Sequence, residues 1–446
     1  MPATLEHPDA TDTQNAPAET ARKRVLMLTH RLPYPPDRGD RIRSFHLLKH
    51  LAHHFDVAIA CVSDEPVWLQ HHQLLSTMAK RVDIQPISGL FNPLRGAAAL
   101  LRGRPVTPAL HFRQGLAQTI RQWHGQQPFD AVLTFCTGMI DYARLVTRPR
   151  QGPASAGGGS ASGGRGPASG GGGSASGGVR HVLDLVDVDS LKWAHYAQTS
   201  WPPMRWVYAA EARRLRRVEA GAFDHFDAVT VVSDAEADAY RQHVGEHPGL
   251  AVVGNGVDLK YFTPMPDAGT KNIVFVGVLN YRPNYEGVVW FAQHVMPSLL
   301  QRVPEAKFQI VGRHPTPKIE QLAERPGIEL VGSVPDVRAY LESAAAVIAP
   351  LQIARGVQNK VLEAMACARP VVCSPGAAQG VDAVDGEHLL VAHDPQQWVD
   401  HLERVLSEAE LRGRLGAAAR AFVEQHYTWK ERLAPMVRIL AGEDQP

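Results

Sequence analysis

The sequence predicts an α/β protein made of two Rossmann-like, doubly wound domains that face each other across a cleft. Its 446 residues suffice for two or three domains with separate cores. Short apolar runs alternate with stretches in which apolar residues recur at helical spacing, and this alternation occurs twice along the chain. A turn cluster at residues 254–258 (GNGVD) lies between the two series and indicates a hinge.

The first series predicts an N-terminal domain over residues 21–255. Wide spacing between its strands, with helical patterns in the intervals, favours parallel βαβ units. Residues 1–20 lack periodicity and predict a disordered tail. Residues 151–178 repeat a unit of Gly, Ser and Ala almost identically, which indicates a flexible insertion within the domain. The expected strands are Arg24–Thr29, Val57–Val62, Ala131–Phe135, Val182–Val186 and Ala228–Val232.

The second series predicts a C-terminal domain over residues 256–425. Its expected strands are Asn272–Gly277, Lys307–Gly312, Ile328–Gly332, Ala346–Pro350 and Pro370–Cys373. A break near His426 would let residues 426–446 return across the hinge toward the N-terminal domain. Because ligands of such folds bind outside the carboxyl ends of parallel strands, the functional site is expected between the two domains.

Composition excludes several classes of protein. Forty-six basic and 45 acidic residues give a net charge of +1, too balanced for a protein that coats a nucleic acid, so no nucleic-acid partner is expected. The chain has no apolar run of membrane-spanning length and no signal-peptide pattern, which predicts a cytoplasmic location. Its cysteines have neither zinc nor disulfide spacing, so free thiols are expected.

The segment 354–370 (ARGVQNKVLEAMACARP) is the most informative for chemistry. A Gly-containing loop enters a helix near Gln358, and helix N-termini bind phosphate. Gly356 with the cations Arg355 and Lys360 can form a diphosphate cradle. Glu363, one turn after Lys360, can accept two hydrogen bonds from the vicinal hydroxyls of a ribose. The alternative is that Glu363 only stabilises the helix and pairs with Lys360.

This segment also carries a family resemblance. NKVLEAMACARPVV resembles the donor-site helix of retaining glycosyltransferases of the GT-B fold, in glycosyltransferase family 4. VVGNGVDLKYFTP resembles the interdomain segment of that family, and IVFVGVLNYRPN resembles the first strand and loop of its nucleotide-binding domain. RVLMLTHRLPYPPDRGDRIRSFHLL, LDLVDVDS and RGVQNKVLEAMA are most similar to sugar transferases of bacterial PEP-CTERM and exosortase exopolysaccharide systems.

The resemblance implies that a sugar passes from a nucleotide-diphosphate sugar on the C-terminal domain to a hydroxyl acceptor on the N-terminal domain. The anomeric configuration would be retained without a required metal or other cofactor. Donor contacts are expected from Glu363, Gly356, Asn359, Arg282, Gly277 and Gly39. Lys360, Arg355 and Asp187 are the expected catalytic residues.

The sequence departs from the family pattern at two points. Arg355 stands where family members commonly carry the first of two glutamates, and it can clamp the diphosphate or an acidic sugar, or be an ordinary surface arginine. Gly277 is followed by Val278, whereas this loop usually supplies cations, so Arg282 is the only nearby cation there. Lys360 and Arg355 therefore become the expected charge partners of the leaving group.

Four residues of the N-terminal domain complete the expected site. Gly39 corresponds in position to the glycine-rich loop of the family, where the backbone approaches donor and acceptor. Arg38 and Arg41 flank it and are expected to contact acceptor or phosphate, with charge-paired solvent exposure as the alternative. Asp187 is expected to reach the donor sugar or the acceptor hydroxyl, and the alternative is a structural cap of the following helix.

Two basic stretches of the N-terminal domain remain. Residues 95–121 contain five arginines, and no acidic residue occurs between Asp83 and Asp130, so contact with the inner leaflet of a membrane is expected, an ordinary solvated face being the alternative. The helix over Arg205–Arg217 has Glu211 and Glu219 nearby and is expected to be a salt-bridged surface.

Taken with the resemblance, these features predict a retaining glycosyltransferase of bacterial exopolysaccharide biosynthesis. Its expected partners are a nucleotide-sugar donor and a glycan or lipid-linked acceptor. Two alternatives are a nucleotide-sugar epimerase on the same fold and a binding protein that has lost catalysis.

Overall fold

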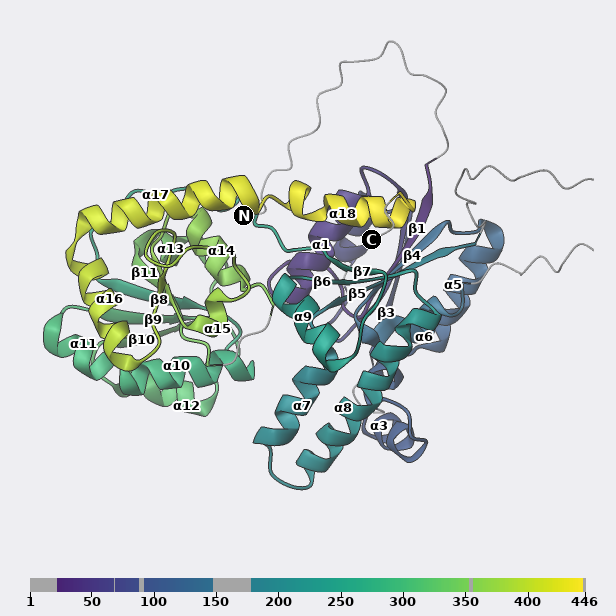
Figure 1. The fold of residues 1–446 in the computed structure, drawn as a ribbon, viewed down its shortest axis with the longest axis horizontal. Helices are drawn as coiled ribbons and strands as arrows, with labels where there is room; N and C mark the ends of the chain where they lie inside the picture. The colour runs from purple at the N-terminus through teal and green to yellow at the C-terminus, as the bar shows by residue number, and fades with distance from the viewer. Residues whose placement is uncertain (1–21, 68, 88–91, 147–177, 353–355, 444–446) are drawn as a thin grey trace, which may run out of the picture.

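The computed structural model describes residues 22–67, 69–87, 92–146, 178–352 and 356–443. They form two parallel sheets covered by helices, which is the predicted pair of Rossmann-like domains (Figure 1). The expected tail over 1–20, nearly all of the expected insertion over 151–178 and Arg355 lie outside the described residues.

The N-terminal sheet has seven strands in the order β3-β2-β1-β4-β5-β6-β7, all parallel. The strands are β1 (Arg24–Thr29), β2 (Asp56–Ser63), β3 (Arg81–Pro86), β4 (Ala131–Phe135), β5 (Arg180–Val186), β6 (Ala228–Val231) and β7 (Leu250–Val252). Its helices are α1 (Gly39–Leu51), α2 (Leu69–Ser76), α3 (Asn92–Leu101), α4 (Val106–His111), α5 (Gln114–Gln126), α6 (Ile140–Ala143), α7 (Asp189–Thr199), α8 (Met204–Ala220) and α9 (Asp234–His243), with 3₁₀ turns at Thr137–Met139 and Gly221–Asp224.

The C-terminal sheet has six parallel strands in the order β10-β9-β8-β11-β12-β13. The strands are β8 (Asn272–Val276), β9 (Lys307–Val311), β10 (Ile328–Gly332), β11 (Ala344–Ala349), β12 (Val371–Cys373) and β13 (Leu390–Val391). The helices that follow and connect them are α10 (Arg282–His294), α11 (Met296–Arg302), α12 (Pro317–Glu320), α13 (Arg338–Ser343), α14 (Asn359–Ala366), α15 (Pro375–Ala378), α16 (Pro395–Ser407), α17 (Ala409–His426) and α18 (Trp429–Ala441), with a 3₁₀ turn at Gln321–Glu324.

The central strands are apolar along their whole length because helices cover both faces of each sheet. Every residue of β4 and of β11 is buried. One apolar core fills the C-terminal domain, and two cores lie in the N-terminal domain. Since the faces of each sheet are covered, polar groups are expected in the loops at the carboxyl ends of the strands.

The chain crosses between the domains a second time at its end. Figure 1 shows α17 lying over the C-terminal domain and α18 continuing over the N-terminal domain beside α1. Leu433, Met436 and Leu440 of α18 belong to the N-terminal core. At the crossing the backbones are in close contact, since a Cβ on Gly256 would lie 2.6 Å from the backbone nitrogen of Trp429. Glycine is required there because any side chain would push the two crossing segments apart.

Candidate active site

The N-terminus of α14 brings together several of the expected donor residues. The helix begins at Asn359, so Lys360 lies in its first turn and Glu363 one turn later. Lys360 donates a hydrogen bond of 2.8 Å to Oδ1 of Asn284, and its Nζ lies 4.1 Å from the centre of the Phe275 ring. Lys360 is therefore hydrogen-bonded to Asn284 of α10, and Glu363 lies one helical turn away.

Burial brings the pKa values of both ionisable side chains of α14 close to 7. Burial lowers the pKa of Lys360 to about 7, although the charge of Glu363 opposes this shift. Burial likewise raises the pKa of Glu363 to about 7, with Lys360 opposing it. A ligand that supplies negative charge to Lys360 and hydroxyl donors to Glu363 would stabilise the charged form of each group.

We expect Glu363→Gln to be as stable as the wild type near pH 4.5 and more stable at pH 7. The folded-state pKa of Glu363 is raised above its ordinary value of 4.5 to about 7, so ionisation favours the unfolded chain as the pH rises through this window. Glutamine carries no charge, and the difference in the free energy of unfolding should grow to about 1–3 kcal/mol. Thermal unfolding between pH 4.5 and pH 8 measures it. The exposed control Glu305→Gln should show no such trend, and a difference independent of pH would contradict the prediction.

Gly277 lies directly against Lys360. A Cβ on Gly277 would lie 2.8 Å from Nδ2 of Asn284 and 3.1 Å from Nζ of Lys360. The space beside the ammonium group therefore exists only because residue 277 has no side chain. Asn284 was not among the expected residues. It could have been proposed from the sequence because it is a polar residue in the first turn of the helix that follows the Gly277 loop.

Gly356 and Asp187 meet across the domain boundary. Gly356 has a φ of +61°, and a Cβ on it would lie 2.5 Å from Oδ1 of Asp187. Val186, which precedes Asp187, also has a positive φ of +68°, a conformation that is unfavourable for a β-branched residue. Strained backbone of this kind clusters at functional sites, and here it turns the chain at the carboxyl end of β5.

A pocket between the two domains is lined by side chains from both. Asp187 and Lys192 come from the N-terminal domain, and Arg282 and Gln358 come from the C-terminal domain. Its other lining residues are His195, Tyr196, Tyr281, Pro283, Glu286 and Leu351. The guanidinium of Arg282 donates to Glu286 at 2.7 Å and to the hydroxyl of Thr199 at 2.7 Å. Arg282 thus already has a carboxylate partner and joins α10 to α7.

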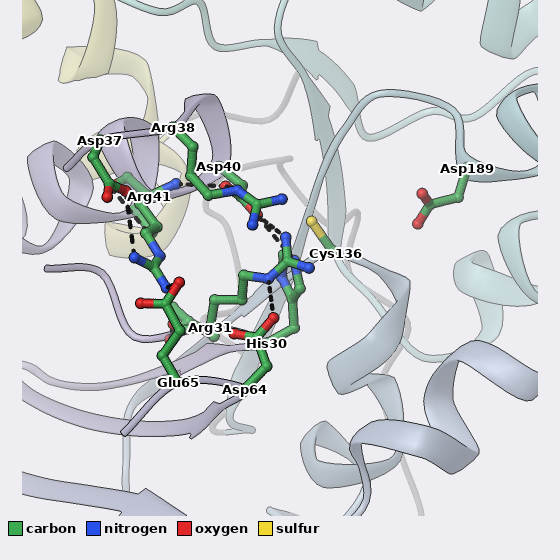
Figure 2. Close-up of polar contacts among 12 residues, drawn as sticks. His30, Arg31, Asp37, Arg38, Asp40, Arg41, Asp64, Glu65, Cys136 and Asp189 are labelled. Carbon is green, nitrogen blue, oxygen red and sulfur yellow. Dashed lines mark hydrogen bonds and ion pairs between the residues drawn. The ribbon is translucent and has the colours of Figure 1, made fainter. Parts of the chain in front are cut away.

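The loop before α1 forms a network of charged side chains at the carboxyl end of β1. Figure 2 shows Arg31 reaching Asp40 and Asp64, with distances of 2.5 Å from its Nη1 and 3.3 Å from its Nε. Arg38 approaches Asp40 at 3.1 Å. Burial alone would raise the pKa of Asp40, but His30 and the arginines hold it well below its usual range. Gly39 begins α1, and a Cβ on it would lie 3.9 Å from Nδ2 of Asn359. The N-termini of α1 and α14 are therefore close neighbours.

Arg41 does not have the position expected of a ligand contact. Its side chain is fully buried, at 3.3 Å from Asp37 and 2.8 Å from Glu65 (Figure 2). Both carboxylates neutralise it within the N-terminal domain, so its role is to hold the loop. Arg38 keeps the partly exposed position, with 32% of its side-chain surface accessible.

A buried chain of polar contacts that the sequence did not indicate connects the core of the N-terminal domain to α14. Arg43 forms two hydrogen bonds with Asp184, at 2.8 and 2.9 Å, and both side chains are wholly buried. The guanidinium also donates to Oδ1 of Asn255 at 2.9 Å, and the Asn255 amide donates to Asn359 at 3.2 Å. Arg313 makes a further interdomain contact, 2.7 Å from Asp37.

The aspartates at the end of β5 do not share one site. Asp184 is bound by Arg43, and Asp189 is paired with Lys192. Within the part of the chain that the structure describes, no group of three or more His, Cys, Asp or Glu side chains is arranged to hold a metal ion. Nor does any described helix combine the length and apolar character needed to span a bilayer.

Comparisons with known proteins indicate the class of protein. Residues 270–408 match the family model described as glycosyl transferases group 1. The chain is similar to a D-inositol 3-phosphate glycosyltransferase of Corynebacterium urealyticum, with 27% identity over 57% of this chain and 67% of the relative. A protein of that name from Xylanimonas cellulosilytica is 30% identical over 48% of this chain and 57% of its own length. The matched part thus spans between about half and two thirds of these curated relatives.

Solved structures resemble nearly the whole chain. Sucrose-phosphate synthase from Thermosynechococcus elongatus matches with a TM-score of 0.65 and 15% identity, over 94% of this chain and 99% of that one. Anabaena HepE in complex with UDP and glucose matches with a TM-score of 0.63 and 14% identity, over 94% and 100%. These likenesses show the GT-B fold, and the family match supports a group 1 glycosyltransferase. The enzyme class indicated is glycosyltransferase.

Proposed function

We propose that the protein is a retaining glycosyltransferase that moves a sugar from a nucleotide-diphosphate sugar to a glycan or lipid-linked acceptor. The observation that carries this proposal is the N-terminus of α14. There Gly277 lies beside the ammonium group of Lys360, and Glu363 follows one helical turn later. Gly356 and Asn359 lie close to Asp187 and Gly39 of the other domain. In this arrangement Lys360 would contact the diphosphate, Glu363 the ribose and Asp187 the acceptor.

The leaving nucleoside diphosphate would be stabilised by Lys360 and the dipole of α14. Burial lowers the pKa of Lys360 to about 7, and an anion within hydrogen-bond reach favours its protonated form. Negative charge develops on the diphosphate as its bond to the sugar breaks, and a preorganised cation lowers the energy of that state. Arg355, outside the described residues, remains a proposed second cation.

Asp187 is the proposed group on the acceptor side. It lies at the carboxyl end of β5, in the interdomain pocket and against Gly356. From there its carboxylate can orient the acceptor hydroxyl or accept its proton. Contacts across the domain boundary, such as Arg313 with Asp37, favour a closed arrangement that excludes water from the activated sugar.

The finer assignment rests on the motif resemblance. It favours family 4 and an exopolysaccharide pathway of the PEP-CTERM and exosortase type, in the cytoplasm and without a resident metal or cofactor. Since Anabaena HepE was solved with UDP and with UDP-glucose, UDP is the first nucleotide to try.

The experiment is a thermal-shift panel with UDP, GDP, ADP, CMP and NAD on the wild type, Glu363→Ala and the exposed control Glu305→Ala. A ligand at 100 times its dissociation constant stabilises a protein by about 2.7 kcal/mol. We expect one nucleoside diphosphate to raise the Tm of the wild type and the control, and Glu363→Ala to lose the response. A response to NAD alone, or an unchanged response of Glu363→Ala, would contradict the proposed donor site. Turnover of the donor without acceptor would indicate an epimerase, and binding without any single-turnover transfer would indicate a protein that only binds.

A further inference from the structure

The α7–α8 hairpin and α3 expose large apolar side chains. Trp201, in the loop at the hairpin tip, and Trp206, near the start of α8, are 87% and 67% exposed. Leu94 and Leu101 of α3 are 68% and 89% exposed, and Met204 lies between the two tryptophans in sequence and is also exposed. Exposed apolar residues gathered on neighbouring elements mark an interaction surface.

The same elements carry an excess of positive charge. Exposed arginines on α8 and just after α3 are Arg102, Arg104, Arg205, Arg213, Arg216 and Arg217. The sequence has no acidic residue over 92–113, and the acidic residues of α8 are Glu211 and Glu219 alone.

The expectation that the glutamates of α8 pair with its arginines is wrong. Glu211 is buried and accepts hydrogen bonds from the backbone nitrogens of Val106 and Thr107, at 2.7 and 2.9 Å, which caps α4. Glu219 is also buried and accepts from the backbone nitrogen of Ser190 at 3.0 Å. Both carboxylates point into the domain, so neither neutralises the arginines on the outer face of α8.

The two elements form one surface. Nη2 of Arg214 on α8 donates to the carbonyl of Leu100 on α3 at 3.1 Å. Figure 1 shows the α7–α8 hairpin projecting from the N-terminal domain, with α3 beside α8. Arg113, which was expected to contribute to a basic face over 95–121, instead donates to the carbonyls of Leu110 and Phe112. The exposed charge is therefore centred on α8 and the C-terminal end of α3.

We propose that this surface, formed by α3, the α7–α8 tip and the outer face of α8, docks the protein on an anionic lipid bilayer. Trp201, Trp206 and Met204 would enter the headgroup region, where indole rings are favoured, and the arginines would contact lipid phosphates. A lipid surface fits better than an acidic protein because the apolar side chains stand out from a projecting tip. This inference does not depend on the proposed transfer reaction.

The test is co-sedimentation of the full chain with vesicles of phosphatidylcholine alone or with about one third phosphatidylglycerol. The variants are Trp201→Ser with Trp206→Ser, and Arg205→Glu with Arg216→Glu. Matched controls change exposed residues of the C-terminal domain: Val384→Ser for the apolar pair and Arg325→Glu with Arg414→Glu for the charges. Thermal unfolding of each variant checks that the fold is retained.

We expect the wild type to bind anionic vesicles at least tenfold more tightly than neutral ones, and high salt to weaken binding. Both test variants should lose at least tenfold in affinity for anionic vesicles, while the controls stay within twofold of the wild type. Absence of binding to anionic vesicles, or equal loss in the controls, would overturn the proposal. Nucleotide binding should be unchanged in the surface variants, so this result is independent of the outcome of the nucleotide panel.

Discussion

Replacing Lys360 with methionine is expected to lower the rate of sugar transfer by about 10²–10³-fold, the usual cost of removing one preorganised donor to a developing anion. Methionine keeps much of the length and apolar packing of the lysine side chain, including the contact with the Phe275 ring. What it removes is the charge beside Gly277 and the hydrogen bond to Asn284. The measurement is kcat with a sugar donor that carries the nucleotide identified by the thermal-shift panel.

The control for this variant is Lys318→Met, an exposed lysine of α12 in the same domain. Its kcat should match that of the wild type. Because burial penalises the charge of Lys360, the Lys360→Met protein should unfold at a temperature no lower than the wild type. A transfer rate within threefold of the wild type would show that the leaving group is stabilised by another cation.

Replacing Asp184 with alanine is expected to destabilise the protein by about 3–5 kcal/mol, because it leaves the guanidinium of Arg43 buried without its carboxylate partner. Both side chains have no solvent exposure, and Thr230 also loses an acceptor at 2.9 Å. Denaturant unfolding of both proteins measures the difference. The double variant Arg43→Met with Asp184→Ala should recover much of the loss, since no unpaired charge then remains.

A matched control is Asp238→Ala, which breaks the exposed pair with Arg241 at 2.8 Å. Its carboxylate is 65% exposed, so the expected loss is below about 1 kcal/mol. An Asp184→Ala variant as stable as this control would contradict the assignment of a buried ion pair. The result also bears on the site, because Arg43 holds Asn255 and Asn255 contacts Asn359 at the start of α14.

Strand prediction succeeded where burial is complete. The expected strands at 24–29 and 131–135 have the bounds of β1 and β4, and the expected strand at 346–350 overlaps β11. These runs are mostly apolar because both faces of each strand are covered, and such runs are visible in a sequence. β3 was missed because it lies at the sheet edge and contains only two large apolar residues, Val82 and Ile84, of which only Ile84 is buried. β13 was missed because it has only two residues.

The local sequence predicts proximity within one helix but not contacts between distant segments. Lys360 and Glu363 share a helix face by spacing alone, so their proximity follows from the local sequence. Asp184, at the end of β5, has Arg43 as its partner, 141 positions away along the chain. No local pattern encodes a contact at that separation.

The sequence alone was sufficient to predict the pair of parallel domains, the helix that begins near Gln358 with Lys360 in its first turn, and the positive charge of α8. Periodicity and charge are local properties of the chain. Tertiary packing determined which side chains are buried and which partners they have. It directed Glu211 and Glu219 inward, enclosed Arg41 between two acids, and placed Gly356 against Asp187 across the domain boundary. The partner of a charged side chain depends on which elements meet in space, and that is settled only when the two domains fold and pack together.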